Sequence, residues 1–554
     1  MIQHFGNLQT SLKSIHSYPA LADQERRFLR AGWLSATARD LWDLWSDPSF
    51  LSSEQRLALN KIEPFDEWEE FALFASHYFL LVAVKGPEGT MNFSQSYVPR
   101  AEPVADLCFP SLAEHFAGGT MSLSLELEVL SKGQGQRRFG AAYQISPEVF
   151  GLHGGLGTQR RLESSDVFKL EHRVYDDKSL PPPSIEARMC HTMTSLKGTD
   201  CLLAGGRTSP DRALADCWLR RSGGAWERVE DLPIPLYRHC AAMVELNDGD
   251  QGVLIYGGKS SKGLISGDWI LWRGHDDWEK LKIDRNNIEP RFGAVMASTA
   301  VQQGILLGGM AEDGTICVEM FEWKISDIET RPSIELKKHG FDVEPLSGIP
   351  NAIHRLGACL TWSYAGLMLI GGISRYLLPQ KHDVVCLFPN PSGSSESDFA
   401  KLKPSIVECG SGPLLVGHSV YAYQDSVALA GGGAVCFSFG TYWNQCIYTL
   451  KMGTHKSESR WSYDEGQKPN SGARTRQESN DALTSSTIPR ILTETAMSIT
   501  PRMHLEDSKG FKRVVDISNP VVMEDMDLGP CVTEWSLEAL KVKVGAQRLV
   551  GILS

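Results

Sequence analysis

The sequence predicts a mainly β protein whose middle, from residue 130 to 452, forms a six-bladed β-propeller. Six diglycines recur along this stretch, and each ends a short apolar run such as GVLIYGG or SVALAGG. The first four are almost evenly spaced, and the last two follow at slightly longer intervals. Self-similarity at about 50 residues is typical of propeller blades. The pairs are Gly154-Gly155, Gly205-Gly206, Gly257-Gly258, Gly308-Gly309, Gly371-Gly372 and Gly431-Gly432.

A second marker precedes each pair at a similar distance, and in five of the six repeats it begins with arginine. Equivalent residues of successive blades lie on one ring, so these arginines are expected on one rim of the propeller. Guanidinium groups there would suit the phosphates of RNA, which they bind bidentately. The open alternative is that each arginine holds its own inter-blade loop through backbone carbonyls. The five are Arg138, Arg188, Arg238, Arg291 and Arg355, and Leu415 begins the sixth marker.

The repeat resembles the kelch repeat, because an aromatic strand such as Asp216-Cys-Trp218, followed by Trp226, comes after the diglycine. In kelch proteins similar to this one, the marker arginines line the substrate face, so the resemblance implies that the five arginines bind substrate. The segment 121–130 alternates apolar and polar residues and is a candidate for the strand that completes the last blade. His191, His239 and His418 flank the marker positions, where a structural role is favoured over acid–base chemistry.

Composition indicates a cytoplasmic protein that does not enter a membrane. The 12 cysteines are scattered singly, without a C-x-x-C pair, which is typical of a reduced compartment and predicts no zinc site. Residues 1–13 lack the pattern of a signal peptide, and the apolar run 71–84 is too short to span a bilayer. The net charge of −12 argues against a generally basic surface but leaves room for a local basic patch.

Residues 1–86 follow a different pattern. Within 36–45, Leu41, Trp42 and Trp45 share one face of an expected helix, and 77–84 is an apolar strand. An acidic run lies between them, and we interpret it as the solvated face of a helix rather than as a metal or catalytic cluster. Its carboxylates, Asp66, Glu67, Glu69 and Glu70, would lie opposite Phe65, Trp68 and Phe71.

Residues 24–45, the run EPFDEWEE and the strand beginning His77-Tyr78 resemble the last third of the leucine carboxyl methyltransferase family. The resemblance implies the C-terminal part of an α/β, S-adenosylmethionine-dependent methyltransferase fold. No G-x-G loop follows a strand here, so the donor-binding half is expected upstream of Met1. We therefore expect this chain to hold neither catalytic nor cofactor-binding residues and to be inactive alone.

A methyltransferase end joined to kelch blades resembles the wybutosine-synthesis family of tRNA-modifying enzymes. The resemblance implies methylation and methoxycarbonylation of the hypermodified guanosine beside the anticodon of phenylalanine tRNA, with the propeller as the substrate-binding platform. Two alternatives stay open. One is a kelch scaffold that recruits a protein partner, and the other is a methyltransferase that acts on a protein's C-terminal carboxylate.

The C-terminal part divides into a flexible linker, 453–487, and a segment, 488–554, that resembles the start of a JmjC-type (cupin) domain. Complete domains of this type use Fe(II) and 2-oxoglutarate on an H-x-D…H triad. Neither His275-Asp276-Asp277 nor His504-Leu-Glu506 is a credible iron site, so no metal is expected, and both ends of the chain look cut. Residues 87–129 would connect the first two domains.

Overall fold

The computed structural model describes the N-terminal segment, the repeats and three short strands near the C-terminus. By contacts the chain divides into two compact units, Met1–Ser457 with Val550–Ser554, and Glu458–Leu549. The described residues are 15–62, 65–85, 122–132, 135–170, 180–246, 249–261, 263–274, 278–285, 288–328, 330–339, 353–363, 366–375, 383–388, 403–407, 413–424, 426–436, 440–455, 502–504, 522–524 and 549–551.

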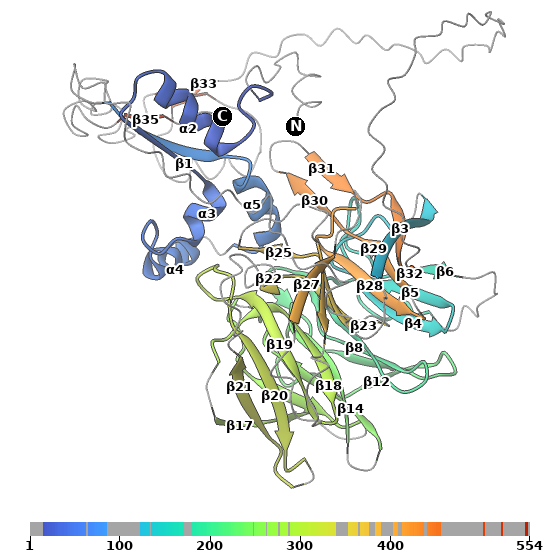
Figure 1. Ribbon diagram of the computed structural model, residues 1–554. Helices are drawn as coiled ribbons and strands as arrows, with labels where there is room; N and C mark the ends of the chain where they lie inside the picture. The colour runs from blue at the N-terminus through green and yellow to red at the C-terminus, as the bar shows by residue number, and fades with distance from the viewer. Residues whose placement is uncertain are drawn as a thin grey trace, which may run out of the picture. The chain divides into compact units, whose positions relative to one another are not determined.

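Six sheets follow one another along the chain and form the blades of the propeller, as predicted (Figure 1). The first has three strands, β4 (Ala141–Ser146), β5 (Val149–His153) and β6 (Ser165–Lys169). The second comprises β7 (Thr192–Ser195), β8 (Cys201–Ala204), β11 (Cys217–Arg220) and β12 (Trp226–Val229). The third comprises β13 (Cys240–Glu245), β14 (Gln251–Tyr256), β15 (Trp269–Trp272) and β16 (Glu279–Lys280).

The remaining blades are longer and the last closes the ring. The fourth comprises β18 (Phe292–Ala300), β19 (Gln303–Met310), β20 (Met320–Ser326) and β21 (Ser333–His339), with β17 (Lys282–Arg285) parallel to β21. The fifth comprises β23 (Cys359–Ser363), β24 (Gly366–Ile370), β26 (Val384–Phe388) and β27 (Lys403–Val407). The sixth comprises β28 (His418–Tyr423), β29 (Ser426–Gly431), β32 (Cys446–His455) and β3 (Ser122–Lys132).

The strand predicted to complete the last blade does so. β3 pairs antiparallel with β32 along Ser122–Lys132, so a segment before the first repeat supplies the outer strand of the sixth blade (Figure 1). The propeller therefore begins near residue 122, not at 130 as the diglycine repeats alone predict. Three short ladders connect strands: β9 (Arg207–Ser209) with β10 (Arg212–Ala213), β22 (Arg355–Leu356) with β25 (Ile373–Ser374), and β30 (Gly433–Cys436) with β31 (Gly440–Trp443).

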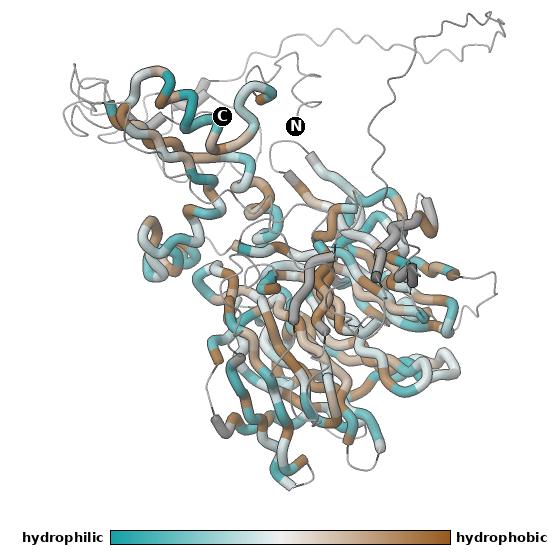
Figure 2. Tube along the Cα trace, viewed as in Figure 1, coloured by the Kyte–Doolittle hydropathy of each residue, from teal (hydrophilic) through white to brown (hydrophobic). Residues whose placement is uncertain are grey.

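The core lies between adjacent blades. Middle strands such as β19 and β24 have neighbouring blades on both faces, so they are almost continuously apolar and buried. Figure 2 shows these strands in brown across the propeller. One cluster joins the third and fourth blades through Leu254, Leu306 and Trp323, all fully buried. Burial of such side chains, at about 25 cal/mol per Å² of apolar surface, is the main force that holds the blades together.

Each diglycine brings two blades into backbone contact. The N–H of Gly155 donates to the carbonyl of Arg188 in the next blade at 2.7 Å, and Gly432 donates to Arg137 at 2.9 Å, which closes the ring. A Cβ atom on Gly308 would lie 2.3 Å from the carbonyl oxygen of Arg355. Any side chain at this position would push the blades apart, which is why glycine recurs there.

A ring of backbone hydrogen bonds surrounds the propeller axis. In each blade, the residue at one equivalent position on this ring adopts a positive φ, between 55° and 66°. Cys190 N donates to Phe139 O, Arg238 N to Cys190 O, and Gly293 N to Arg238 O, at 2.7 to 2.9 Å. We call these residues the axial ring and the side of the propeller that carries them the axial face. The axial ring comprises Phe139, Cys190, Arg238, Gly293, Gly357 and Gly417.

The N-terminal module packs in the same compact unit as the propeller. It contains α2 (Leu21–Arg30), β1 (Ser35–Asp40), α3 (Leu41–Ser46), α4 (Ser53–Ile62), α5 (Trp68–Ala75) and β2 (Phe79–Val84). β1 pairs antiparallel with β2, and β35 (Leu549–Gly551) is the third strand in the order β1-β2-β35.

The expected helix over 36–45 is only partly correct. Residues up to Asp40 form β1, and the Asp40 side chain then accepts from Asp43 N at 2.7 Å and caps α3. Within the short helix Trp42 is 2% exposed and Leu41 is 37% exposed, so the two do not share a buried face. The strand predicted over 77–84 is present as β2.

Little of the C-terminal unit falls within the described residues. β33 (Arg502–His504) pairs parallel with β34 (Val522–Glu524). The predicted linker and most of the JmjC-like segment lie outside the described residues. Among the helices that are described, none has the length and apolar character needed to cross a membrane.

The diglycine contact predicts the effect of adding a single methyl group. Gly308→Ala combines a positive φ with a Cβ 2.3 Å from a backbone oxygen, whereas Gly249→Ala meets a positive φ in open space. We expect Gly249→Ala to lower the free energy of unfolding by about 1 kcal/mol and Gly308→Ala by about 3 kcal/mol. Urea unfolding followed by tryptophan fluorescence measures both, and equal losses would contradict the close approach.

Candidate functional site on the axial face of the propeller

Three of the five predicted arginines hold their own blades together. Arg188, Arg291 and Arg355 are at most 1% exposed, and each donates from Nη1 to the carbonyl of the first glycine in its own blade's pair. The distances are 2.9 Å to Gly205, 3.2 Å to Gly308 and 2.8 Å to Gly371. These three arginines therefore follow the alternative named above, in which each arginine binds backbone carbonyls within the propeller.

The other two arginines do not occupy the same blade position, so the prediction of one shared position is wrong. In the first blade it is Arg137 whose Nη1 donates to the diglycine carbonyl of Gly154, at 2.8 Å. In the third blade the equivalent residue is Leu236, whose carbonyl accepts from Gly206. Arg138 lies one residue after Arg137, and Arg238 lies two residues after Leu236. Their side chains pair with Glu70 and Glu69 of the N-terminal module rather than with a diglycine carbonyl.

The axial face is built from short antiparallel bridges, in which directly paired residues place their side chains on the same side. The first three blades contribute most of the basic residues and the next two contribute apolar ones. By blade, the paired sets are Arg138-Leu156-Arg161, Met189-Arg207-Ala213, Tyr237-Lys259-Ile265, Phe292-Met310-Ile316 and Leu356-Ile373.

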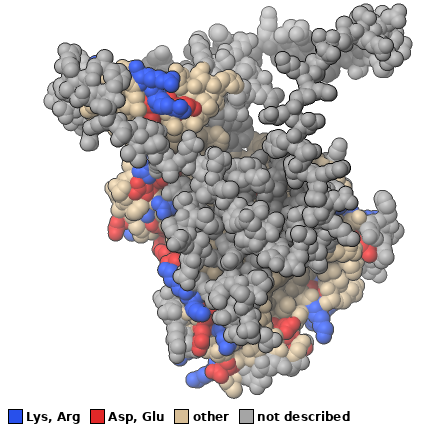
Figure 3. Space-filling model, in the orientation of Figure 1, with Lys and Arg blue, Asp and Glu red and all other residues tan. Residues whose placement is uncertain are grey.

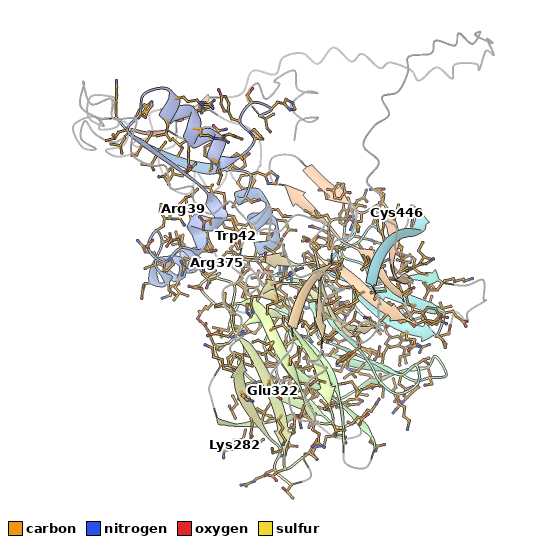
Figure 4. All side chains as sticks on the ribbon, viewed as in Figure 1. Arg39, Trp42, Lys282, Glu322, Arg375 and Cys446 are labelled. Carbon is orange, nitrogen blue, oxygen red and sulfur yellow. The ribbon has the colours of Figure 1, made fainter. Side chains whose placement is uncertain are left out.

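The N-terminal module covers the apolar half with aromatic side chains. Trp42 and Trp68 form one buried cluster with Phe292, Met310 and Leu356. Trp42 Nε1 donates to Ser374 O at 3.1 Å. Figure 4 labels Trp42 and Arg375, which lie close together where α3 meets the fifth blade. Arg375 donates to Ser46 O at 3.3 Å, so this junction joins the two parts by both packing and hydrogen bonds.

The basic half is neutralised by the acidic run around α5. Glu69 accepts from both Nη atoms of Arg238, at 2.5 and 2.9 Å, and Glu70 pairs with Arg138. Asp66 pairs with Lys259 at 2.8 Å and also with Arg207. These carboxylates are buried, so the interpretation of the run as a solvated face is wrong for Asp66, Glu69 and Glu70. Glu67, which points away, is exposed.

Glu69 reaches the centre of the axial ring. It is 1% exposed, and a Cβ atom on Gly357 would lie 2.9 Å from its Oε1, so this glycine leaves room for the carboxylate. Arg238, itself an axial-ring residue, has its guanidinium 5.0 Å from the ring centroid of Phe139. A carboxylate from α5 therefore fills the propeller axis on this face.

Opposite charges set the protonation of the buried cluster. Burial disfavours a charged Asp66, but Arg238, Lys259 and Arg207 together hold its pKa below its usual range. The pKa of Glu70 is raised by burial and by the charge of Glu69, against the opposing effect of Arg138. Three carboxylates and four cations in contact thus form one coupled network.

The flanking histidines are buried and remain neutral. Burial lowers the pKa of His239 and of His418 to about 4. His239 Nε2 lies 2.9 Å from Thr192 Oγ1, and His191 stacks edge-on against His153 with ring centroids 5.4 Å apart. The structural role favoured for these residues is the one the structure supports, because a group that stays neutral in the core cannot exchange protons with a substrate.

Within the described ranges, no three His, Cys, Asp or Glu side chains gather as metal ligands. Several carboxylates of the N-terminal module are engaged: Glu25 accepts from Ala38 N at 2.8 Å, and the α5 carboxylates pair with the propeller. His275-Asp276-Asp277 lies outside the described residues, and β33 ends at His504, of whose side chain nothing is described. S-adenosylmethionine, Fe(II) and 2-oxoglutarate stay predictions.

Sequence reasoning missed Arg207 and Lys259, although a signal was present. Both directly follow a diglycine, in the sequences GGR and GGK. The residue after each pair bridges to the marker and points to the axial face. A search for charges at that position would have identified them.

These features define a class of protein: a six-bladed propeller that carries an α/β module on its axial face through buried ion pairs. The family described as "tRNA wybutosine-synthesizing protein 4, beta-propeller" matches residues 183–446. The protein of that name from Aspergillus fumigatus is 37% identical over 567 residues, covering 99% of this chain and 51% of the relative. Its Aspergillus oryzae counterpart is 36% identical, covering 99% and 53%.

The similarity extends beyond these moulds. In Schizosaccharomyces pombe the protein of the same name is 24% identical over 466 residues, covering 82% of this chain and 65% of the relative. The chain belongs to the tRNA wybutosine-synthesizing protein 4 family over the part that it spans. It spans about half the length of the Aspergillus relatives.

The ion pair between Glu69 and Arg238 predicts a large and specific loss of stability. Glu69→Gln leaves a buried guanidinium without its counter-charge, and we expect the free energy of unfolding to fall by about 3 kcal/mol. Glu67→Gln, in the same acidic run but exposed, is the matched control and should change it by less than about 0.5 kcal/mol. Urea unfolding followed by tryptophan fluorescence compares the two.

The double variant Glu69→Met, Arg238→Met separates the charge effect from packing. Removing both charges leaves no unpaired ion, so we expect it to recover most of the stability that Glu69→Gln loses. If Glu69→Gln and Glu67→Gln unfolded at the same urea concentration, the buried pair would not hold α5 in solution.

The buried histidines predict acid sensitivity. Burial lowers the pKa of His153 to about 3 and of His239, His354 and His418 to about 4. Between about pH 6.5 and 4 the unfolded chain binds protons that the folded chain does not, so the free energy of unfolding falls as pH drops. Each histidine contributes up to about 1.4 kcal/mol per pH unit. Urea midpoints from pH 7.5 to 5 measure the slope.

A pair of variants assigns that slope. His239→Gln should make the decline with falling pH shallower, because one buried proton acceptor is gone. His77→Gln, at an exposed position, should leave the slope unchanged. A slope equally steep in both variants would show that other groups cause the acid sensitivity.

Proposed function

We propose that the chain is part of a tRNA-modifying enzyme of wybutosine biosynthesis. The observation that carries this proposal is the similarity along 99% of the chain to proteins named tRNA wybutosine-synthesizing protein 4. That similarity includes the N-terminal module as well as the propeller. The structure adds that the two are packed together through α3 and α5, so neither is an independent attachment.

The proposed substrate is phenylalanine tRNA, at the hypermodified guanosine beside the anticodon. The proposed chemistry is methylation and methoxycarbonylation with S-adenosylmethionine as donor, supported by the resemblance of residues 24–45 and 63–78 to leucine carboxyl methyltransferases. No described residue of this chain is assigned to the donor, so its residues contribute by binding and orienting. We propose a cytoplasmic location, which the free thiols of the described cysteines support.

In this proposal the propeller is the platform that orients the methyltransferase module. α5 and the residues before it give the axial face Glu69, Glu70 and Asp66, and the next element, β2, belongs to the module's sheet. A tRNA contact by Arg138 or Arg238 would require α5 to leave, and Arg188, Arg291 and Arg355 lie beneath the face. We therefore assign these five predicted substrate-binding arginines to holding the platform together.

Disruption of the gene tests this function directly. We expect phenylalanine tRNA from the disrupted strain to lack wybutosine and to accumulate its unmethylated precursor, as measured by mass spectrometry of tRNA nucleosides. Restoring the gene with Glu69→Gln should recover less wybutosine than restoring it with Glu67→Gln, because only the former loosens α5 on the propeller. Normal wybutosine in the disrupted strain would overturn the proposal and favour a kelch-type scaffold that recruits a protein partner.

A further inference from the structure

The axial face carries more positive charge than the α5 segment neutralises. Five cations lie on it, and three carboxylates, Asp66, Glu69 and Glu70, pair with four of them. The exception is Arg161, which has no ion pair with any described residue. The cations are Arg138, Arg161, Arg207, Arg238 and Lys259. A net excess of two positive charges therefore remains on the side of the first two blades.

The position of Arg161 follows from its bridge partners. Leu156 pairs with Arg138 on one side and with Arg161 on the other, so all three side chains point to the axial face. Arg161 is half-buried, and its Nε atom is enclosed without an acceptor among the described residues. An enclosed N–H without an acceptor is unfavourable, so this guanidinium lacks part of its counter-charge and hydrogen bonding among the described residues.

Arg207 of the second blade is the neighbouring cation. It is 6% exposed, it pairs with Asp66, and its Nε also lacks an acceptor among the residues that the structure describes. Its guanidinium lies 4.8 Å from the ring centroid of Tyr237, which fixes its plane. Burial and the charge of Arg207 together lower the pKa of Arg161, as expected for two cations that share too little counter-charge.

The described part of the N-terminal module packs mainly on the later blades. Its aromatic cluster packs on residues of the third to sixth blades, and its ion pairs with described residues of the first two blades are those of Glu70 and Asp66. The hairpin tip 158–160, which immediately precedes Arg161, is exposed and adds the charge of Arg160. Figure 3 shows other Lys and Arg side chains beside acidic ones on the described parts of the face in view.

We propose that Arg161, supported by the charge of the neighbouring Arg207, binds a phosphate group of the RNA substrate at the edge of the axial face formed by the first two blades. This inference rests on the proposed function, which supplies tRNA as the substrate. Phosphate fits because guanidinium groups bind it bidentately, and the excess of two charges matches one phosphate and its neighbour along the backbone. Asp66 also pairs with Arg207 and bounds the site on the side toward α5, so the bound RNA would lie next to α5.

Binding of the anticodon stem-loop of phenylalanine tRNA to the whole chain tests the site. We expect Arg161→Ala to weaken binding about 5- to 10-fold and to reduce the slope of log affinity against log salt by about 0.7 to 0.9. Arg161→Lys should keep the salt slope and lose only part of the affinity. Arg212→Ala is the matched control, since this arginine of the second blade is 61% exposed and already pairs with Glu186 at 2.7 Å.

The outcomes separate this inference from the proposed function. If the unaltered chain binds the RNA and Arg161→Ala binds it equally well with an unchanged salt slope, the phosphate site is wrong and the proposed function stands. If the unaltered chain binds no RNA, both the site and the platform role fail. Arg161→Glu, which should weaken binding further, repeats the test, and thermal unfolding of each variant verifies that it is folded.

Discussion

The close approach of neighbouring blades at the diglycines is the constraint on which the rest of the structure depends. The second glycine of a pair donates its N–H to a carbonyl of the next blade, as Gly155 does to Arg188. Because that carbonyl lies two residues before the axial ring, the contact also fixes where each axial-ring residue sits. A β-carbon at Gly308 would collide with the equivalent carbonyl of the fifth blade, that of Arg355. The register of each blade relative to the next therefore depends on glycine.

Once the register is fixed, the axial face follows, and its composition decides how α5 lies. Apolar side chains from the later blades give the aromatic residues of α3 and α5 their buried surface, which supplies most of the favourable free energy. The ion pairs of Glu69 and Glu70 contribute differently. Buried pairs gain little net stability over apolar packing, but a mispaired charge is costly, so they select one orientation of α5 among several that would bury the same surface.

Much of the propeller could be predicted from the sequence, because its repeats are local and periodic. The blade number and the closing strand before the first repeat were both correct. The arginine register was not, because spacing alone cannot align it: Arg238 lies further ahead of Gly257 than Arg355 lies ahead of Gly371. The acidic run was misread for another reason. Helical periodicity reports which residues share a face, but it cannot show that Arg238, far along the chain, will cover Glu69.

The protein's net charge of −12 conceals a basic surface that exists only because the fold assembles it. Arg138, Arg207 and Lys259 come from three different blades and lie more than 50 residues apart in the sequence. The aromatic side chains of α5 pack on the apolar blades, which fixes where its carboxylates meet this surface. The carboxylates in and just before α5 pair with four of the cations, and the fifth, Arg161, has no ion pair with a described residue. The unequal distribution of apolar and basic residues among the blades thus both anchors the module and leaves an excess of positive charge beside it.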